Sequence, residues 1–126
     1  MKHISLLMSS TSEETLDTFA QKIFKLLIIE NYEERFSSHY VDDHYFLGTN
    51  ADVKFHVMLS DDEDYSDLPF WLELSIVNLE SELNEEDVNN LVHNKLLTSG
   101  FNVARIDNFG QIGEIRKDYQ LANSTE

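Results

Sequence analysis

The sequence has no cysteine, which excludes disulfide bonds, thiolate metal sites and cysteine nucleophiles. Glycine and proline are also scarce, with four and one among 126 residues. No glycine-rich phosphate loop and no Gly-x-Ser-x-Gly elbow of a serine hydrolase is present. Basic residues number nine against 24 acidic ones, so the formal net charge is −15. These absences predict a protein that is not an enzyme and needs no cofactor.

The excess of acidic residues also excludes classes of partner. Nucleic acids carry dense negative charge and repel a protein of this charge at long range, and anionic membrane surfaces repel it for the same reason. Basic proteins are attracted to it and approach it quickly. Acidity can equally do no more than keep a small protein soluble, so net charge leaves both interpretations open.

Long hydrophobic runs are missing as well. The first ten residues contain one lysine and a short apolar run. A secretory signal needs about 7–15 apolar residues and a membrane span about 18. We therefore expect a cytoplasmic protein. The length and the 41% apolar content predict a single domain over residues 1–120, followed by a frayed C-terminal tail at 121–126.

A first amphipathic helix is predicted from about residue 12 to 29. Apolar residues recur there at steps of three and four, and Thr11–Glu14 has the spacing of a capping box. The apolar run Leu26–Ile29 is predicted to be buried on two sides, with a strand beginning near residue 26 as the alternative. Residues 31–36 are predicted to form a last helical turn or the exit loop.

A second helix is predicted between Asn84, whose side chain can cap it, and Gly100, which can end it in the left-handed conformation. Gly48 and the four residues after it form a turn cluster that predicts a hairpin between its flanking runs. Apolar alternation or short apolar runs predict strands at 3–9, 44–47, 53–59, 70–77, 101–106 and 111–117.

The predicted order of elements is therefore β-α-β-β-β-α-β-β. Three consecutive central strands favour antiparallel pairing, and two single-faced helices can cover one face of a sheet. The predicted fold class is α+β, a two-layer sandwich with a mainly antiparallel sheet and two helices. The nearest named topology is the ferredoxin-like arrangement.

The acidic residues are concentrated in one segment. Residues 55–94 hold 11 acids and no lysine or arginine, although the whole chain has nine basic residues. Such a block is either a solvated face or an interaction surface. Its densest part is the loop before the strand at 70–77, where aromatic residues stand beside the acids and can anchor an interface. The predicted partner-binding residues are Asp61, Asp62, Glu63, Asp64, Tyr65, Asp67 and Trp71.

No metal site is predicted. Asp61 begins an acidic run, but an EF-hand loop counted from it would need Gly at the position of Ser66 and Glu at the position of Leu72. His39 and His44 are separated by five residues, which aligns them neither on a strand nor on a helix. Elemental analysis should therefore find no stoichiometric zinc or calcium.

The chain resembles the immunity proteins of bacterial contact-dependent growth inhibition and related polymorphic toxin systems. The resemblance is carried by a single cysteine-free acidic domain, with the loop Asp61–Asp67 followed by Phe70-Trp71. It implies a cytoplasmic inhibitor that binds and neutralises a cognate toxin, often a basic nuclease. The predicted oligomeric state is a monomer or a weak dimer.

An acidic secretion chaperone that holds a partly unfolded effector is the alternative function. Leu26–Ile29 and the outward face of the strand at 70–77 would supply its apolar grooves. Gel filtration separates the two functions, because such a chaperone is usually dimeric. A neighbouring reading frame that encodes a basic toxin domain would favour the inhibitor.

Overall fold

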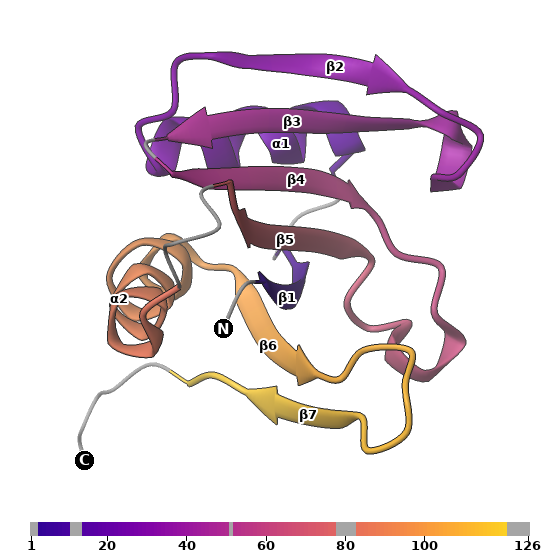
Figure 1. The fold of residues 1–126 in the computed structure, drawn as a ribbon, viewed down its shortest axis with the longest axis vertical. Coiled ribbons are helices and arrows are strands. Elements are labelled where there is room, and N and C mark those ends of the chain that lie inside the picture. The colour runs from indigo at the N-terminus through magenta and orange to yellow at the C-terminus, as the bar shows by residue number, and fades with distance from the viewer. Residues whose placement is uncertain (1–2, 11–13, 51, 78–82, 121–126) are drawn as a thin grey trace.

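The structure, a computed structural model, describes residues 3–10, 14–50, 52–77 and 83–120. In these residues seven strands form one antiparallel sheet in the order β2-β3-β4-β5-β1-β6-β7 (Figure 1). The elements are β1 His3–Ser9, α1 Leu16–Leu26, β2 Tyr32–Phe36, β3 His44–Asn50, β4 Val53–Leu59, β5 Phe70–Ile76, α2 Glu85–Leu91, β6 Asn102–Asp107 and β7 Ile115–Asp118. The predicted α+β fold class is confirmed.

The centre of the sheet has the ferredoxin-like strand order. β5 lies between β1 and β4, and β1 lies between β5 and β6, with every neighbouring pair antiparallel. Strands β1 and β4 are therefore parallel to each other, as are β5 and β6, and each parallel pair is separated by one strand. Two parallel strands with a third strand between them form a split β-α-β unit, and the fold contains two such units. Strands β2 and β3 extend one edge of this core, and β7 extends the other.

Both helices contribute to one core against the same face of the sheet, and Figure 1 shows α1 crossing behind β3 and β4. The apolar stripe of α1 is buried because it faces the alternate residues of the strands. Phe19 of α1 stacks on Phe70 of β5, with ring centroids 4.0 Å apart, and meets Phe101 edge to face at 5.5 Å. Trp71, the next residue on β5, consequently points to the opposite face and is only half-buried.

The first helix is shorter than predicted at both ends. Its N-cap is Thr15, whose hydroxyl accepts a hydrogen bond from the Thr18 N–H at 3.2 Å, so the cap lies after the predicted capping box. Residues 11–13 of that box lie outside the described residues. At the other end, Ile28 adopts a φ of 57° and is 72% exposed, while Leu27 and Ile29 are buried. The expected burial of the whole apolar run was therefore wrong, because the helix ends in a turn inside it.

Residues 32–36 form an edge strand instead of the predicted helical turn or exit loop. Strand β2 pairs with β3 from Tyr32 opposite Gly48 to Phe36 opposite His44. All five residues of β2 are exposed, so the segment has no apolar alternation that would indicate a strand. The predicted order of elements thus lacked one strand.

The hairpin between β3 and β4 is confirmed, but β3 runs through Gly48 to Asn50. Gly48 is inside the strand for a steric reason. A Cβ atom at this position would lie 2.5 Å from Cε1 of Phe24 and 3.0 Å from Cγ2 of Ile29. The glycine therefore allows the end of α1 to approach the sheet closely, whereas the sequence suggested a turn.

The second helical segment begins after Asn84 and ends at Gly100 as predicted, although regular α-helix extends only from Glu85 to Leu91. The side chain of Asn84 accepts hydrogen bonds from the backbone N–H groups of Glu86 and Asp87, at 2.8 and 3.3 Å. After α2 the chain continues in a π-helical turn and a 3₁₀ turn up to Gly100, which has a φ of 94°. The predicted C-terminal tail at 121–126 lies outside the described residues.

Candidate binding surface on the open face of the sheet

The face of the sheet opposite the helices, here called the open face, is partly covered by two loops. It is formed by alternate residues of the strands, namely His3, Ser5 and Leu7 of β1, Lys54, His56 and Met58 of β4, Trp71, Glu73 and Ser75 of β5, and Ala104 and Ile106 of β6. At one end, a second small core buries Leu7, Leu68, Ala104 and Ile106 beneath Tyr65, Trp71 and Phe109. The loops β4–β5 and β6–β7 therefore meet over this end of the sheet.

The acidic loop, residues 61–67, is held in place by two contacts with the β6–β7 region. The Tyr65 hydroxyl donates a hydrogen bond of 2.5 Å to Oε2 of Glu114, whose Oε1 accepts one of 2.7 Å from the Gly110 N–H. This hydrogen bond is the main reason why the pKa of Tyr65 is raised to about 12. Tyr65 packs against the small core that contains the buried Leu68, so apolar contacts also hold this loop on the sheet.

The second contact of the acidic loop is an ion pair between Asp67 and Arg116 of β7. The two guanidinium N–H groups reach the two carboxylate oxygens at 2.9 and 3.2 Å, and Arg116 also pairs with Asp118. The hydrogen bonds from Arg116 hold the pKa of Asp67 below its usual range. The guanidinium carbon lies 5.7 Å from the ring centroid of Tyr65. Tyr65 and Asp67 thus fasten the loop to the rest of the fold.

The remaining acids of the loop point outward from this fastened base. Asp61, Glu63 and Asp64 are exposed, and none of them makes an ion pair with another described residue. Asp62 accepts a hydrogen bond of 2.9 Å from the Asp64 N–H and so caps the 3₁₀ turn formed by residues 63–65. The structure therefore places six of the predicted site residues on the acidic loop and Trp71 on the adjacent strand β5. Tyr65 and Asp67 anchor the loop to the rest of the fold.

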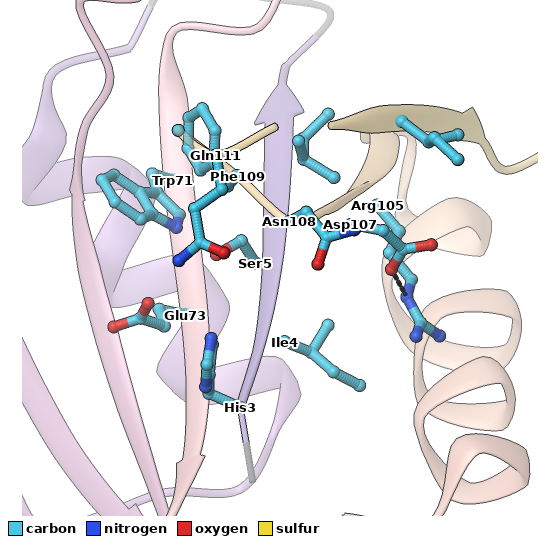
Figure 2. A pocket seen from close by; sticks show the side chains of 13 residues that line it. His3, Ile4, Ser5, Trp71, Glu73, Arg105, Asp107, Asn108, Phe109 and Gln111 are labelled. Atoms are coloured by element: carbon cyan, nitrogen blue, oxygen red, sulfur yellow. Dashed lines mark hydrogen bonds and ion pairs between the residues drawn. The ribbon is translucent and has the colours of Figure 1, made fainter. Parts of the chain in front are cut away.

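Two hollows flank the central pair Trp71 and Glu73. The β1 hollow, about 950 Å³, has His3 and Ser5 on its floor and the β6–β7 loop on its rim. Figure 2 shows Trp71, Glu73, Ser5 and His3 turned toward it from β5 and β1, with Phe109 at its edge.

The acidic-loop hollow, about 620 Å³, lies on the other side of Trp71 and Glu73. It is enclosed by residues 38–41, by the end of β4 and by Asp61 and Asp62. Trp71, Glu73 and Phe109 line both hollows, which therefore form one depression across the open face.

Glu73 is the half-buried carboxylate of this depression. It makes no hydrogen bond or ion pair with another described residue, and burial raises its pKa above the ordinary value. Its cross-strand neighbour His56 does not neutralise it, because burial lowers the pKa of His56, and nearby Lys54 and Arg35 lower it further. The charge of His3 on β1 lowers the pKa of Glu73 by less than burial raises it. A partly desolvated carboxylate in a depression is a candidate residue of a ligand site.

Two ring nitrogens on the open face are buried and have no hydrogen-bond partner among the described residues, namely Nε1 of Trp71 and Nδ1 of His56. A buried unpaired donor or acceptor costs about 1–3 kcal/mol. Tyr40 is held above this region by stacking on Tyr45, with centroids 4.1 Å apart, and Tyr45 stacks in turn on His56 at 5.8 Å. Burial, followed by the charges of Tyr45 and Glu73, raises the pKa of Tyr40. The open face thus carries polar groups that the isolated fold leaves unsatisfied.

Glu73 was not among the predicted site residues. Alternation along β5 was a signal for its position, since Trp71 and Glu73 share a face. No sequence signal marked Tyr40, Phe109 or Arg116, because they reach the site through loops and strand pairing distant in the chain.

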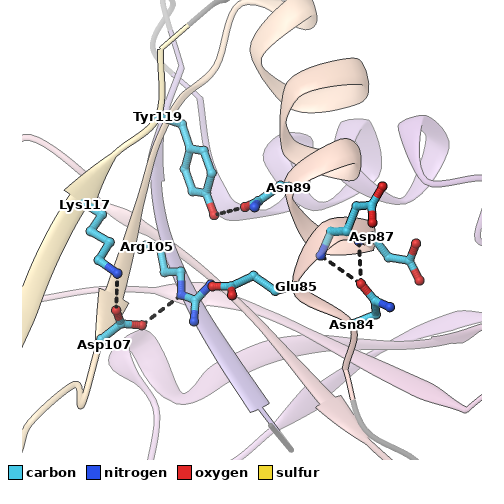
Figure 3. Close-up of polar contacts among 9 residues, drawn as sticks. Asn84, Glu85, Asp87, Asn89, Arg105, Asp107, Lys117 and Tyr119 are labelled. Carbon is cyan, nitrogen blue, oxygen red and sulfur yellow. Dashed lines mark hydrogen bonds and ion pairs between the residues drawn. The ribbon is translucent and has the colours of Figure 1, made fainter.

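At the start of α2, an acid of the segment 55–94 is paired with a basic residue from elsewhere in the chain. Figure 3 shows the start of α2, where Glu85 accepts a hydrogen bond of 2.7 Å from Arg105 of β6. Arg105 also pairs with Asp107 at 2.8 Å, and Asp107 with Lys117 at 3.2 Å. These bases lie outside residues 55–94, so the segment lacks bases in sequence but obtains some in space. Residues 61–64 form no ion pair with a base in the described part of the chain.

One cluster of described residues could hold a divalent metal, and it lies away from the open face. Asp17 of α1, Glu34 of β2 and His44 of β3 offer ligand atoms within 4.8 Å of one another. His44 Nε2 is 3.5 Å from Asp17 and 3.7 Å from Glu34. Ligands of a tetrahedral zinc ion, with bonds near 2.0–2.1 Å, are about 3.3 Å apart. The sequence-based expectation of no metal stays a prediction, since spacing along the chain could not reveal these three residues together.

Comparison with protein-family models, curated proteins and solved structures finds no match. None of the helices in the described part of the chain combines the length and the apolar character needed to cross a bilayer. The function must therefore be inferred from the residues of this chain.

Proposed function

We propose that this chain is a cytoplasmic immunity protein, which binds a basic toxin domain through its acidic loop and blocks it. The observation that carries the proposal is the fastening of that loop by Tyr65–Glu114 and Asp67–Arg116, which leaves Asp61, Glu63 and Asp64 facing outward. The two anchors hold the loop in one conformation while it displays these acidic side chains to solvent.

Fixing the loop favours binding for a thermodynamic reason. A flexible loop loses conformational freedom when it binds, and that loss weakens the complex, whereas a preorganised loop has little left to lose. Concentrated negative charge also steers a positively charged partner toward the surface and raises the association rate. A nuclease that grips phosphates presents a positive cleft, so an acidic loop of this kind can occupy it.

An RNA-binding role is a reasonable comparison, because a ferredoxin-like sheet with aromatic side chains on its open face is a common RNA-binding geometry. Trp71 and Tyr45 stand on that face here. The formal charge of −15 opposes such a role, since RNA binding draws most of its affinity from neutralising phosphates. A protein partner agrees better with the charge.

The alternative of a secretion chaperone finds less support in the structure. Leu27 and Ile29 are buried, so the run Leu26–Ile29 does not offer an apolar groove. The outward face of β5 carries Glu73 and Ser75 beside Trp71, which makes it mixed rather than apolar.

Growth protection tests the proposal. Cells that express a basic toxin domain from the neighbouring reading frame should grow only when this chain is co-expressed. The triple variant D61N/E63Q/D64N should lose protection. The matched control E30Q/D52N/E86Q removes the same charge from exposed acids elsewhere and should retain it.

Binding kinetics of the purified pair supply a second measurement. The association rate should fall steeply between about 0.05 and 0.5 M salt, because the Debye length falls well below the protein radius. Protection by the triple variant, or an association rate that salt does not change, would refute the proposed role of the acidic loop.

A further inference from the structure

We propose that the acidic-loop hollow binds the side chain of an arginine that the protein partner inserts. This inference rests on the proposed function, because it names the chemistry by which the same surface would recognise its partner. It goes beyond the acidic loop by assigning the contact to a defined cavity and to Glu73 at its base.

The walls of the hollow suit a planar cation. Tyr40, Trp71 and Phe109 line it from three separate segments of the chain. Trp71 and Phe109 are themselves in contact, with ring centroids 4.9 Å apart and planes at 64°. Aromatic faces attract a guanidinium group through the cation–π interaction, and arginine also stacks flat on such rings.

The charges around the hollow suit the same occupant. Asp61, Asp62 and Glu73 line it, and His39 is the sole lining residue that can carry positive charge. Arginine pairs with carboxylates through its fork of N–H groups, and such charge-assisted bonds are stronger than neutral ones. Lys54 and Arg35, the bases near His56, are not among the lining residues.

Glu73 gives the hollow its specificity for a cation. It lies between the two hollows, is half-buried and makes no hydrogen bond or ion pair with another described residue. The base that acts on its pKa is His3, which lines the β1 hollow and not the acidic-loop hollow. Desolvation makes an unpaired carboxylate less favourable, so a cation that reaches it is bound more strongly than at an exposed acid. The volume of about 620 Å³ leaves room for the side chain and for part of the backbone that carries it.

Trp71 provides the readout, because it is the single tryptophan of the sequence and lines the hollow. The probe is the peptide acetyl-Gly-Arg-Gly-amide, titrated at low salt while Trp71 emission is recorded. The comparison peptide replaces arginine with citrulline, which has nearly the same shape but no charge. Wild type should show a saturable change in emission with the arginine peptide and at least about tenfold weaker binding of the citrulline peptide.

Two variants complete the experiment. E73Q should weaken binding of the arginine peptide about tenfold or more, with circular dichroism confirming the fold, because a charge-assisted bond is lost. E30Q removes one exposed acid outside the hollow and should bind as wild type does. Equal binding of both peptides, no response of Trp71, or an unchanged affinity of E73Q would overturn the inference.

These outcomes are separable from failure of the proposed function. If the arginine peptide does not bind but D61N/E63Q/D64N still abolishes growth protection, the acidic loop binds the partner without this cavity. If the triple variant still protects cells, the proposed function fails whatever the peptide does.

Discussion

Asp67 is predicted to stabilise the fold, unlike the three outward acids of the same loop. Its carboxylate receives two hydrogen bonds from Arg116 of β7, which ties the loop to the edge of the sheet. Replacing it with asparagine removes the charge and keeps the shape. The variant therefore loses the ion pair with Arg116, whereas neutralising Asp61, Glu63 or Asp64 removes no ion pair with another described residue.

The expected loss of stability in D67N follows from the solvent exposure of the Asp67–Arg116 pair. The side chain of Asp67 is 60% exposed and that of Arg116 28% exposed, so solvent screens the pair and Arg116 retains Asp118 when Asp67 is neutralised. A surface ion pair of good geometry is worth about 0.5–1 kcal/mol. In a domain of this size 1 kcal/mol moves Tm by about 3–5 °C, so D67N should lower Tm by about 2–5 °C.

The variant D61N/E63Q/D64N should keep its thermal stability but lose partner binding. Its acids make no ion pair with another described residue, and their mutual repulsion is relieved, so its Tm should stay within about 2 °C of wild type or rise. Its binding to a basic partner should weaken strongly, because close charge pairs at an interface are worth about 2–5 kcal/mol when one member is removed.

Thermal unfolding followed by circular dichroism measures both effects, with a D67N/R116Q double-mutant cycle to isolate the coupling. The pH dependence provides a check. Because Arg116 lowers the pKa of Asp67 in the folded state, the stabilisation is present above the unfolded pKa, near 4, and is lost as the pH falls through the folded pKa. A D67N protein as stable as wild type at pH 6, or a triple variant less stable than D67N, would refute this account.

Three further predictions concern other parts of the molecule. E73Q should raise Tm at pH 7, because burial raises the folded pKa of Glu73 and the wild type therefore loses stability as the pH rises through that pKa. The difference in Tm between E73Q and wild type should vanish near pH 3.5 in the same melts, where the carboxyl group is protonated. G48A should lower the unfolding free energy by about 1–3 kcal/mol in urea titration, because its Cβ would overlap the buried ring of Phe24; an unchanged midpoint would contradict the packing described. Elemental analysis of the purified protein should show no stoichiometric zinc or calcium, and a zinc content lost in H44A would identify the Asp17–Glu34–His44 cluster as a metal site instead.

Much of the fold was predictable because its signals are local. The alternation of apolar residues in β4 and β5 predicts which face of each strand is buried, and the apolar stripe of α1 predicts its buried face. The second helical segment lies between Asn84, which caps it by hydrogen bonds, and Gly100, which ends it in the left-handed conformation. The exposed edge strand β2 escaped prediction because its pairing partner, and not its own composition, makes it a strand. Gly48 was misplaced for a similar reason, since the ring that requires a glycine comes from α1.

The candidate site likewise has features that the sequence determines and features that require the tertiary structure. The sequence by itself determined the excess of acids, their concentration in residues 61–67 and the outward direction of Trp71, because composition and period-two alternation are properties of the chain. The tertiary structure alone decided which acids stay free, since Arg116 and Glu114 approach the loop from 49 residues away. It also placed Tyr40 and Phe109 beside Glu73 to form a cavity. Contacts between distant segments arise from strand order and loop packing, and the spacing of residues along one sequence carries no direct record of either.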